Sequence, residues 1–187
     1  KRLCSVIYYG VIERKITLDY IIAQLITRPI EKLDLTVLNI LRCGIYQILY
    51  MDNIPDNAAV NESVTLAKKF KKASASGMVN AVLRNFIRRD KQYAVPMDIL
   101  ISSSVEYSAP VWMIDSFIAD YGMEKMTNLL SDALKKPPVT VRFNTLKASE
   151  SEIIAQLGEI KAKKSSLLEN CYELDGGDIT ATDAFKN

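Results

Sequence analysis

The sequence predicts a mainly α-helical fold, in which a helical bundle is followed by a smaller, incomplete α+β unit. Apolar residues recur at three- and four-residue spacing as far as Tyr93, which is the period of amphipathic helices. Between Val139 and Lys147 apolar and polar residues alternate instead, as they do in a strand with one polar face. The chain has 187 residues, 49% apolar and 25% charged, a size that can bury one large core or two small ones.

The first predicted helices surround a central one. Thr17 is expected to cap a helix with apolar residues at helical spacing, and Pro29 to end that helix and start the next. The next helix carries a broad apolar stripe from Val37 to Leu49, which is too wide for a helix on the protein surface. We therefore expect this segment to be the core helix of the bundle.

Two further helices are expected on either side of the sequence KKASASG, residues 71–77. Asp56 or Asn57 can cap the first of them. A rotation of 100° per residue gives each helix an apolar face and a polar face. The polar faces carry Asn61, Thr65, Lys68, Lys69 and Lys72 in the first helix, and Asn80, Arg84, Arg88 and Lys91 in the second.

The character of the chain changes after Pro96, and we predict a helical domain over residues 1–100 and a second unit over residues 101–187. Residues from Ser102 onward are expected to form a Ser-rich linker that leads into a helix initiated by Pro110. A second helix is expected from Met123 to Leu134, where a Lys-Lys-Pro-Pro sequence stops it.

The last part of the chain predicts a small sheet. The alternating segment Val139–Lys147 is expected to be a strand, and the sequence SLLENCYEL, residues 166–174, a second one. Ser149 and Glu152 have the spacing of a capping box, which predicts a helix from Ser149 to Leu157. We interpret this region as an α+β unit whose final element is missing.

Several classes of function are excluded by composition. The chain contains no histidine, which removes Ser-His-Asp and Cys-His catalysis. It has no Gly-rich phosphate-binding motif, so we expect no cofactor and no catalytic residue in this chain. Cys4, Cys43 and Cys171 are too few and too scattered for a disulfide framework or a zinc site, and we interpret them as packing residues.

The sequence also gives expectations about cellular location, metal binding and oligomeric state. No apolar run approaches the roughly 20 residues that cross a bilayer, so we expect no membrane contact and a cytoplasmic location. We also expect no metal and a monomer. Because the chain lacks an initiator methionine and opens inside a helical pattern, we interpret it as part of a longer protein.

Positive charge is concentrated in one segment. The net charge of the chain is +2, but residues 61–91 hold eight basic and two acidic residues, a net charge of +6. The first 60 residues are nearly neutral and the last 96 are acidic. Such asymmetry is expected of a surface that binds a polyanion, and we weigh nucleic-acid binding about evenly against a merely solvated helix face.

Four sequence motifs carry a resemblance to a known family. IPDNAAVNESVTLAKKF (residues 54–70) and GMVNAVLRNFIRR (77–89) resemble the paired helices of the NusB-like RNA-binding fold. EYSAPVWMI (106–114) and PPVTVRFNTLK (137–147) resemble the segment that precedes the catalytic domain in the 16S rRNA cytosine-5 methyltransferase B family, of Sun/Fmu type. Where that family usually has the sequence YSHP, this chain has Ala109 in place of histidine.

The resemblance implies an RNA-binding N-terminal region of an S-adenosylmethionine-dependent rRNA cytosine-5 methyltransferase. Such a region would position 16S rRNA for a catalytic domain that binds the cofactor and that is absent from this chain, so the fragment itself is expected to be inactive. In such enzymes a cysteine thiolate adds to C6 of cytosine, and the base must leave its stack to be reached. Cys4, Cys43 and Cys171 lack the family's preceding proline and do not inherit that role.

On this interpretation, the basic side chains grip RNA phosphates. The candidate RNA-binding residues are Lys68, Lys69, Lys72, Arg84, Arg88, Lys91, Arg142 and Asn144. Arg142 could equally be the charge partner of an edge strand.

Two other functions are left open at this point. The first is a NusB-type transcription antitermination factor, which binds RNA without catalysis and which would end near Lys91. The second is a bundle whose basic face binds an acidic protein.

Overall fold

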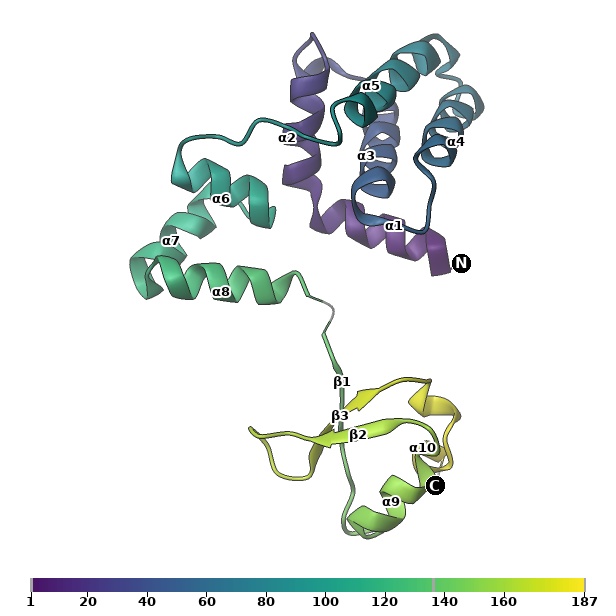
Figure 1. Ribbon diagram of the computed structural model, residues 1–187, viewed down its shortest axis with the longest axis vertical. Coiled ribbons are helices and arrows are strands. Elements are labelled where there is room, and N and C mark those ends of the chain that lie inside the picture. The colour runs from purple at the N-terminus through teal and green to yellow at the C-terminus, as the bar shows by residue number, and fades with distance from the viewer. Residues whose placement is uncertain (1, 136, 187) are drawn as a thin grey trace. The chain divides into compact units, whose positions relative to one another are not determined.

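The computed structural model describes residues 2–135 and 137–186 and divides into two compact units, Lys1–Leu134 and Lys135–Asn187 (Figure 1). We call them the helical unit and the sheet unit. In packing, the chain therefore divides after Leu134 and not at residue 100, because the helix Ile99–Tyr107 packs on the bundle and the two helices that follow it pack in series on that helix. No helix in the described residues is long and apolar enough to cross a membrane.

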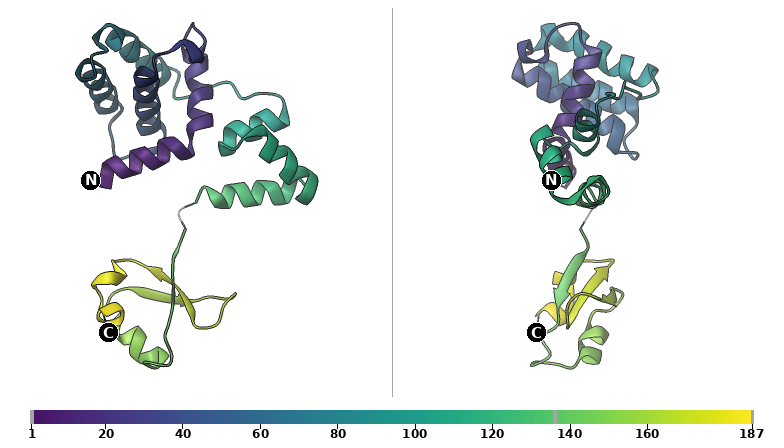
Figure 2. Two further views of the ribbon diagram at one scale, coloured as in Figure 1. Left: turned by 180° about the vertical axis from the view of Figure 1, so that it is seen from behind. Right: turned by 90° about the vertical axis from the view of Figure 1, so that its left-hand side faces the viewer.

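The helical unit is built around one central helix, as the apolar stripe predicted. Helix α3 contacts all four other bundle helices, as the views in Figures 1 and 2 also show. Leu41 and Ile45 of α3 are fully buried. The bundle helices are α1 (Arg2–Glu13), α2 (Lys15–Leu25), α3 (Leu35–Tyr50), α4 (Asp56–Lys69) and α5 (Ser76–Arg88), and short 3-10 turns span Ile30–Lys32 and Ala73–Ala75.

The predicted helix boundaries near Thr17 and Pro29 are wrong. Helix α2 begins at Lys15 and ends at Leu25, so Thr17 lies inside it and Pro29 lies in the following connection. Helix α3 begins beyond that connection because the carboxylate of Asp34 accepts hydrogen bonds from the free amides of its first turn. Helix α4 begins at Asp56 itself and has no side-chain cap.

The predicted Ser-rich linker is a helix, α6 (Ile99–Tyr107), capped by the carboxylate of Asp98. Serine can face a core because its side chain is small and can bond to the backbone. Ser103 and Ser104 are buried here, and the Ser104 hydroxyl donates to the carbonyl of Ala109 (2.6 Å). Helices α7 (Val111–Tyr121) and α8 (Met123–Ala133) follow, close to the bounds expected, and α6 packs on α2 of the bundle.

Two hydrogen bonds join α2 to α6, and each satisfies a backbone group that a helix end leaves free. The Thr17 hydroxyl donates to the carbonyl of Val105 in the last turn of α6 (2.6 Å). In return, the amide of Ile16 in the first turn of α2 donates to the hydroxyl of Ser108 (3.1 Å). The two helix ends therefore cap each other.

A glycine in α1 allows another close approach. A β-carbon at Gly10 would overlap the ring of Tyr46, which lies on α3. Glycine lets α1 lie against the core helix at this point, and the aromatic ring fills the space that a side chain would need.

The sheet unit is a three-stranded antiparallel sheet with strand order β1-β3-β2. The expected strands are confirmed in shorter form, because Asn144 ends the first one in a turn. The capping box of Ser149 and Glu152 is confirmed. Strand β2 was not predicted. The elements are β1 (Val139–Arg142), α9 (Glu150–Gln156), β2 (Lys161–Lys164), β3 (Cys171–Asp175), a 3-10 turn (Ile179–Ala181) and α10 (Asp183–Lys186).

The three cysteines differ in environment. Cys171 is buried in the sheet unit, as predicted for a packing residue. Cys43 is partly buried on α3, and burial raises the pKa of its thiol. Cys4 is exposed on α1, so its interpretation as a packing residue is wrong.

Candidate RNA-binding surface

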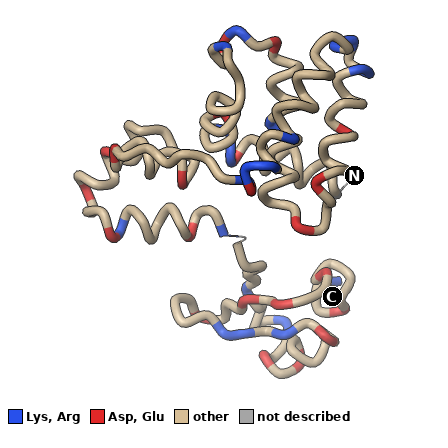
Figure 3. The backbone as a smooth tube through the Cα atoms, turned by 45° about the horizontal axis from the view of Figure 1, so that its top comes forward, with Lys and Arg blue, Asp and Glu red and all other residues tan. Residues whose placement is uncertain are grey.

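The eight candidate residues fall into three groups on the two units. Helices α4 and α5 form a hairpin, and an ion pair between Lys91 and Asp56 (3.0 Å) ties the end of α5 to the start of α4. The chain directions of the two helices are therefore opposed. Figure 3 shows the basic positions along the backbone. The ends of the hairpin are about 20 Å apart, since each residue of a helix rises about 1.5 Å.

The basic segment of the sequence is therefore two groups in space. We call the group at the loop of the hairpin the loop-end lysines, which are Lys68, Lys69 and Lys72. We call the group at the other end the α5-end cations, which are Arg84, Arg88 and Lys91. The third group, Arg142 and Asn144, belongs to the sheet unit.

The loop-end lysines differ in exposure and in ion pairing. Lys68 and Lys69 are exposed on the last turn of α4, where positive charge suits the negative end of the helix dipole. Lys72 is paired with the Asp34 carboxylate (2.6 Å), whose pKa is lowered by this hydrogen bond. Asp34 also caps α3, so the charge of Lys72 is already engaged in holding the hairpin loop to the core helix.

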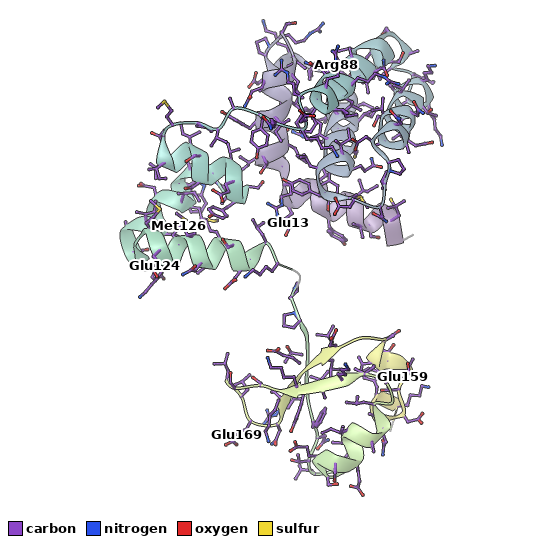
Figure 4. The ribbon with its side chains drawn as sticks, viewed as in Figure 1. Glu13, Arg88, Glu124, Met126, Glu159 and Glu169 are labelled. Carbon is purple, nitrogen blue, oxygen red and sulfur yellow. The ribbon has the colours of Figure 1, made fainter. Side chains whose placement is uncertain are left out.

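Two of the α5-end cations, Arg84 and Arg88, line a cavity. The Arg84 Nε donates to the Asn80 Oδ1 one turn earlier (2.9 Å), which orients the guanidinium group. Arg88, labelled in Figure 4, is exposed on the last turn of α5. Among the described residues, neither arginine has a carboxylate within ion-pair distance. The cavity has a volume of about 320 Å³ and is lined by Asn57, Ala81, Arg84, Ile87 and Arg88.

The third group lies at the edge of the sheet. Arg142 ends β1, which is an edge strand, and Asn144 follows it in a turn where its side chain accepts a hydrogen bond from the amide of Leu146 (3.2 Å). Both side chains are exposed and line a cavity of about 570 Å³ together with the ring of Phe143. No carboxylate of the described residues forms an ion pair with Arg142. The alternative role of Arg142 as the charge partner of an edge strand is therefore not supported within the described residues.

A cluster of tyrosines around Arg14 was missed at the level of sequence. The Arg14 guanidinium lies over the ring of Tyr50 (5.0 Å), which packs against Tyr46 (5.3 Å). Tyr20 and Tyr93 form a second pair (6.4 Å). Burial raises the pKa of Tyr46, Tyr50 and Tyr93, so all three stay neutral at physiological pH. Tyr46 and Tyr50 are one turn apart on α3, but Arg14, Tyr20 and Tyr93 are distant from them in the sequence, and no local pattern could have joined these residues to that pair.

The position at which the resembled family has histidine is buried here. Ala109 is 7% exposed and packs among residues of α7 and α8, and its carbonyl accepts the hydrogen bond from Ser104 described above. In this chain, position 109 is thus a small packing residue in the turn between α6 and α7. The described residues contain no group of three or more potential metal-ligating side chains.

Two protein families match consecutive parts of the chain. Residues 1–88 match the NusB family. Residues 109–179 match the RsmF/B-like methyltransferase, ferredoxin-like domain family. The first match covers the bundle with its basic hairpin, and the second covers α7, α8 and most of the sheet unit.

Similar proteins carry both regions. The probable ribosomal RNA small subunit methyltransferase B of Synechocystis sp. is 34% identical over 168 residues, 89% of this chain and 38% of that protein. Its namesake in Bacillus subtilis is 31% identical over 188 residues, 99% of this chain and 42% of that protein. The ribosomal RNA small subunit methyltransferase B of Escherichia coli K12 is 29% identical over 163 residues, 87% of this chain and 37% of that protein. The chain thus spans about two fifths of the length of these relatives.

A solved structure shares the fold. The crystal structure of PH0851 aligns with 98% of this chain and 42% of its own, with a TM-score of 0.67 and 18% sequence identity.

Proposed function

Since this chain belongs to the ribosomal RNA small subunit methyltransferase B family, with a NusB family domain followed by an RsmF/B-like ferredoxin-like domain, we propose that it binds ribosomal RNA and positions it for methyl transfer. The proposed RNA is 16S rRNA and the proposed product is a cytosine methylated at C5. A monomer acting in the cytoplasm is part of the same proposal. The observation that carries it is the order of the two domains, with an exposed basic hairpin inside the first.

The chemistry assigns binding and orientation to this chain. In the proposed reaction, a thiolate of the whole protein would add to C6 of cytosine, S-adenosylmethionine would supply the methyl group for C5, and loss of the C5 proton would release the thiolate. The target base has to leave its stack, so a domain that holds nearby RNA in register lowers the entropic part of the barrier. We assign the thiolate and the cofactor to the part of the protein outside this chain.

The candidate residues contribute unequally in this proposal. Lys68, Lys69, Arg84 and Arg88 have charges available for phosphates, whereas Lys72 and Lys91 first hold the hairpin through Asp34 and Asp56. Arg142 and Asn144 provide a second, separate contact on the sheet unit. The match of residues 109–179 to a methyltransferase-associated domain favours this proposal over an antitermination factor.

Two measurements test the proposal. Filter binding should detect saturable binding of a 16S rRNA fragment, with a weaker response to duplex DNA of equal length. Calorimetric titration of the same chain with S-adenosylmethionine should give no saturable heat. Failure to bind the rRNA would remove the RNA-positioning role, and saturable cofactor binding would overturn the assignment of the cofactor to another part of the protein.

The methylation itself is tested on the whole protein. It should transfer labelled methyl groups to 16S rRNA, and mass spectrometry of the digested RNA should identify 5-methylcytosine. A different modified nucleoside would correct the proposed chemistry but leave the role of this chain unchanged.

A further inference from the structure

We propose that the cavity between the last turns of α5 and the first turn of α4 holds one nucleotide of a single-stranded RNA, with its phosphates on Arg84 and Arg88. This inference rests on the proposed function and deepens it, because it distinguishes one nucleotide-binding site from the remaining positive charge of the hairpin.

The two arginines are arranged to hold phosphates. They lie one helical turn apart, which places their β-carbons about 5–6 Å from each other on one face of α5. The hydrogen bond from Nε of Arg84 to Asn80 leaves both terminal nitrogens of that guanidinium free to donate. Charge-assisted hydrogen bonds of this kind are roughly twice as strong as neutral ones, and two arginines can share successive phosphates.

Repulsion by the Asp56 carboxylate at the start of α4 is reduced. Asp56 precedes Asn57 of the cavity wall and would disfavour an anion if its charge were unpaired. The Lys91 ammonium is 3.0 Å from that carboxylate. Lys91 reaches this position because it has a left-handed backbone (φ 61°), and its amide closes the end of α5 on the carbonyl of Phe86 (3.1 Å).

The remaining walls fit a nucleoside better than a phosphate alone. Ala81 and Ile87 give the cavity an apolar side, on which a ribose or a base can pack. The Asn57 side chain can both donate and accept, so it can pair with the edge of a base or with a 2′-hydroxyl group. A volume of about 320 Å³ is at the lower end of small-ligand sites, as expected for one nucleotide.

The loop-end lysines lack these features. Lys72 is bound to Asp34, and Lys68 and Lys69 line none of the described cavities. Lysine is a flexible point charge, whereas arginine presents a planar set of donors. We therefore assign diffuse attraction to the loop-end lysines and a fixed contact to the opposite end of the hairpin.

Fluorescence anisotropy with a labelled oligouridylate of about 12 nucleotides tests the site on the full chain. Arg84→Gln with Arg88→Gln should weaken binding at least about tenfold, because glutamine cannot form charge-assisted hydrogen bonds to phosphate. The slope of log K against log salt should become shallower by about one to two. The matched control is Lys68→Gln with Lys69→Gln, which removes the same charge from the same hairpin and should weaken binding less than threefold.

A second pair of variants separates the nucleoside contact from charge. Asn57→Ala should weaken binding severalfold and leave the salt slope unchanged, because no charge is lost. Asn61→Ala, one turn further along α4 and outside the cavity, should have no effect. Thermal melts by circular dichroism should show all four variants folded with only small shifts, since the substituted side chains face solvent.

The outcomes distinguish failure of the nucleotide site from failure of RNA binding by the chain. Equal weakening by the arginine and lysine pairs, or no effect of Asn57→Ala, would overturn the nucleotide site but leave RNA binding intact. Displacement of the oligouridylate by polyglutamate at the same charge concentration would assign the cavity to an acidic protein. A wild-type chain that binds neither this RNA nor rRNA would overturn the proposed function as well.

Discussion

The helical unit has a large core enclosed by helices, whereas the sheet unit has a small core with a cavity beside it. In the helical unit, α3 is enclosed by four helices and Leu41 is fully buried. In the sheet unit, the core consists of Phe143, Leu157 and Tyr172, and a cavity of about 570 Å³ opens beside two of them. The basic hairpin is therefore supported by a large, enclosed core, whereas Arg142 and Asn144 are supported by a small core with few buried residues.

The largest expected effect compares two buried leucines. Leu41→Ala should lower the free energy of unfolding of the helical unit by about 3–4 kcal/mol, because the surrounding helices cannot collapse into the space. Leu157→Ala should cost the sheet unit about 2 kcal/mol, because this side chain already borders a cavity. Denaturant titrations followed by NMR signals of each unit measure both. Equal losses, or a single transition shared by the two units, would break the comparison.

The next effect concerns a charge pair inside the bundle. The Arg42 guanidinium donates two hydrogen bonds to Asp19 (2.6 and 2.7 Å) and one to Asn39 (2.8 Å). Asp19→Ala leaves this largely buried cation unpaired and should destabilise the helical unit by about 2 kcal/mol in chemical denaturation. Asp19→Leu combined with Arg42→Met removes both charges and should recover most of the loss. A double variant no better than the single one would contradict the electrostatic explanation.

A smaller effect tests whether α6 belongs to the bundle. Thr17→Val keeps the shape of the side chain but removes the hydroxyl that caps Val105, and should cost about 1 kcal/mol. Thr17→Ser keeps the hydroxyl and should cost less. Hydrogen exchange of the α6 amides should accelerate in the valine variant. Unchanged exchange would mean that α6 is held by its apolar contacts alone.

The smallest effect is a pH dependence at the hairpin loop. The hydrogen bond from Lys72 lowers the pKa of Asp34, so the pair stabilises the fold above the ordinary carboxyl pKa and its contribution is lost as pH falls below about 4. Lys72→Ala should raise the pKa of Asp34 towards its usual value, as an NMR titration of the carboxyl group can measure. The amides of Thr36 and Val37 should keep part of the shift. An unchanged pKa would mean that these amides alone set it.

Sequence patterns predicted which face of a helix is buried better than they predicted which residues are close in space. The wide stripe from Val37 to Leu49 identified the core helix, and the capping box of Ser149 identified the start of α9, because both are local. Lys68, Lys69, Arg84 and Arg88 lie on exposed helix faces as predicted, whereas Lys72 and Lys91 lie beyond the helix ends and are half-buried in ion pairs. The sequence also does not reveal that an antiparallel hairpin separates the two ends of this charged segment.

Two of the errors, at Thr17 and at the Ser-rich segment, have a common physical cause. Thr17 and Ser104 are residue types that cap helices or fill loops when water surrounds them. Here each finds a backbone carbonyl inside the protein, at Val105 and Ala109, and so each lies buried within a helix. Their burial depends on contacts nearly 90 residues apart in one case, and composition alone carries no trace of such a contact.

The close approach at Gly10 carries an evolutionary consequence. The ring of Tyr46 occupies the volume that a β-carbon at position 10 would need, so neither position can change freely while the other stays as it is. Among diverging homologues, a larger residue at position 10 should accompany a smaller one at position 46. Covariation at these two positions would record a steric constraint between α1 and α3.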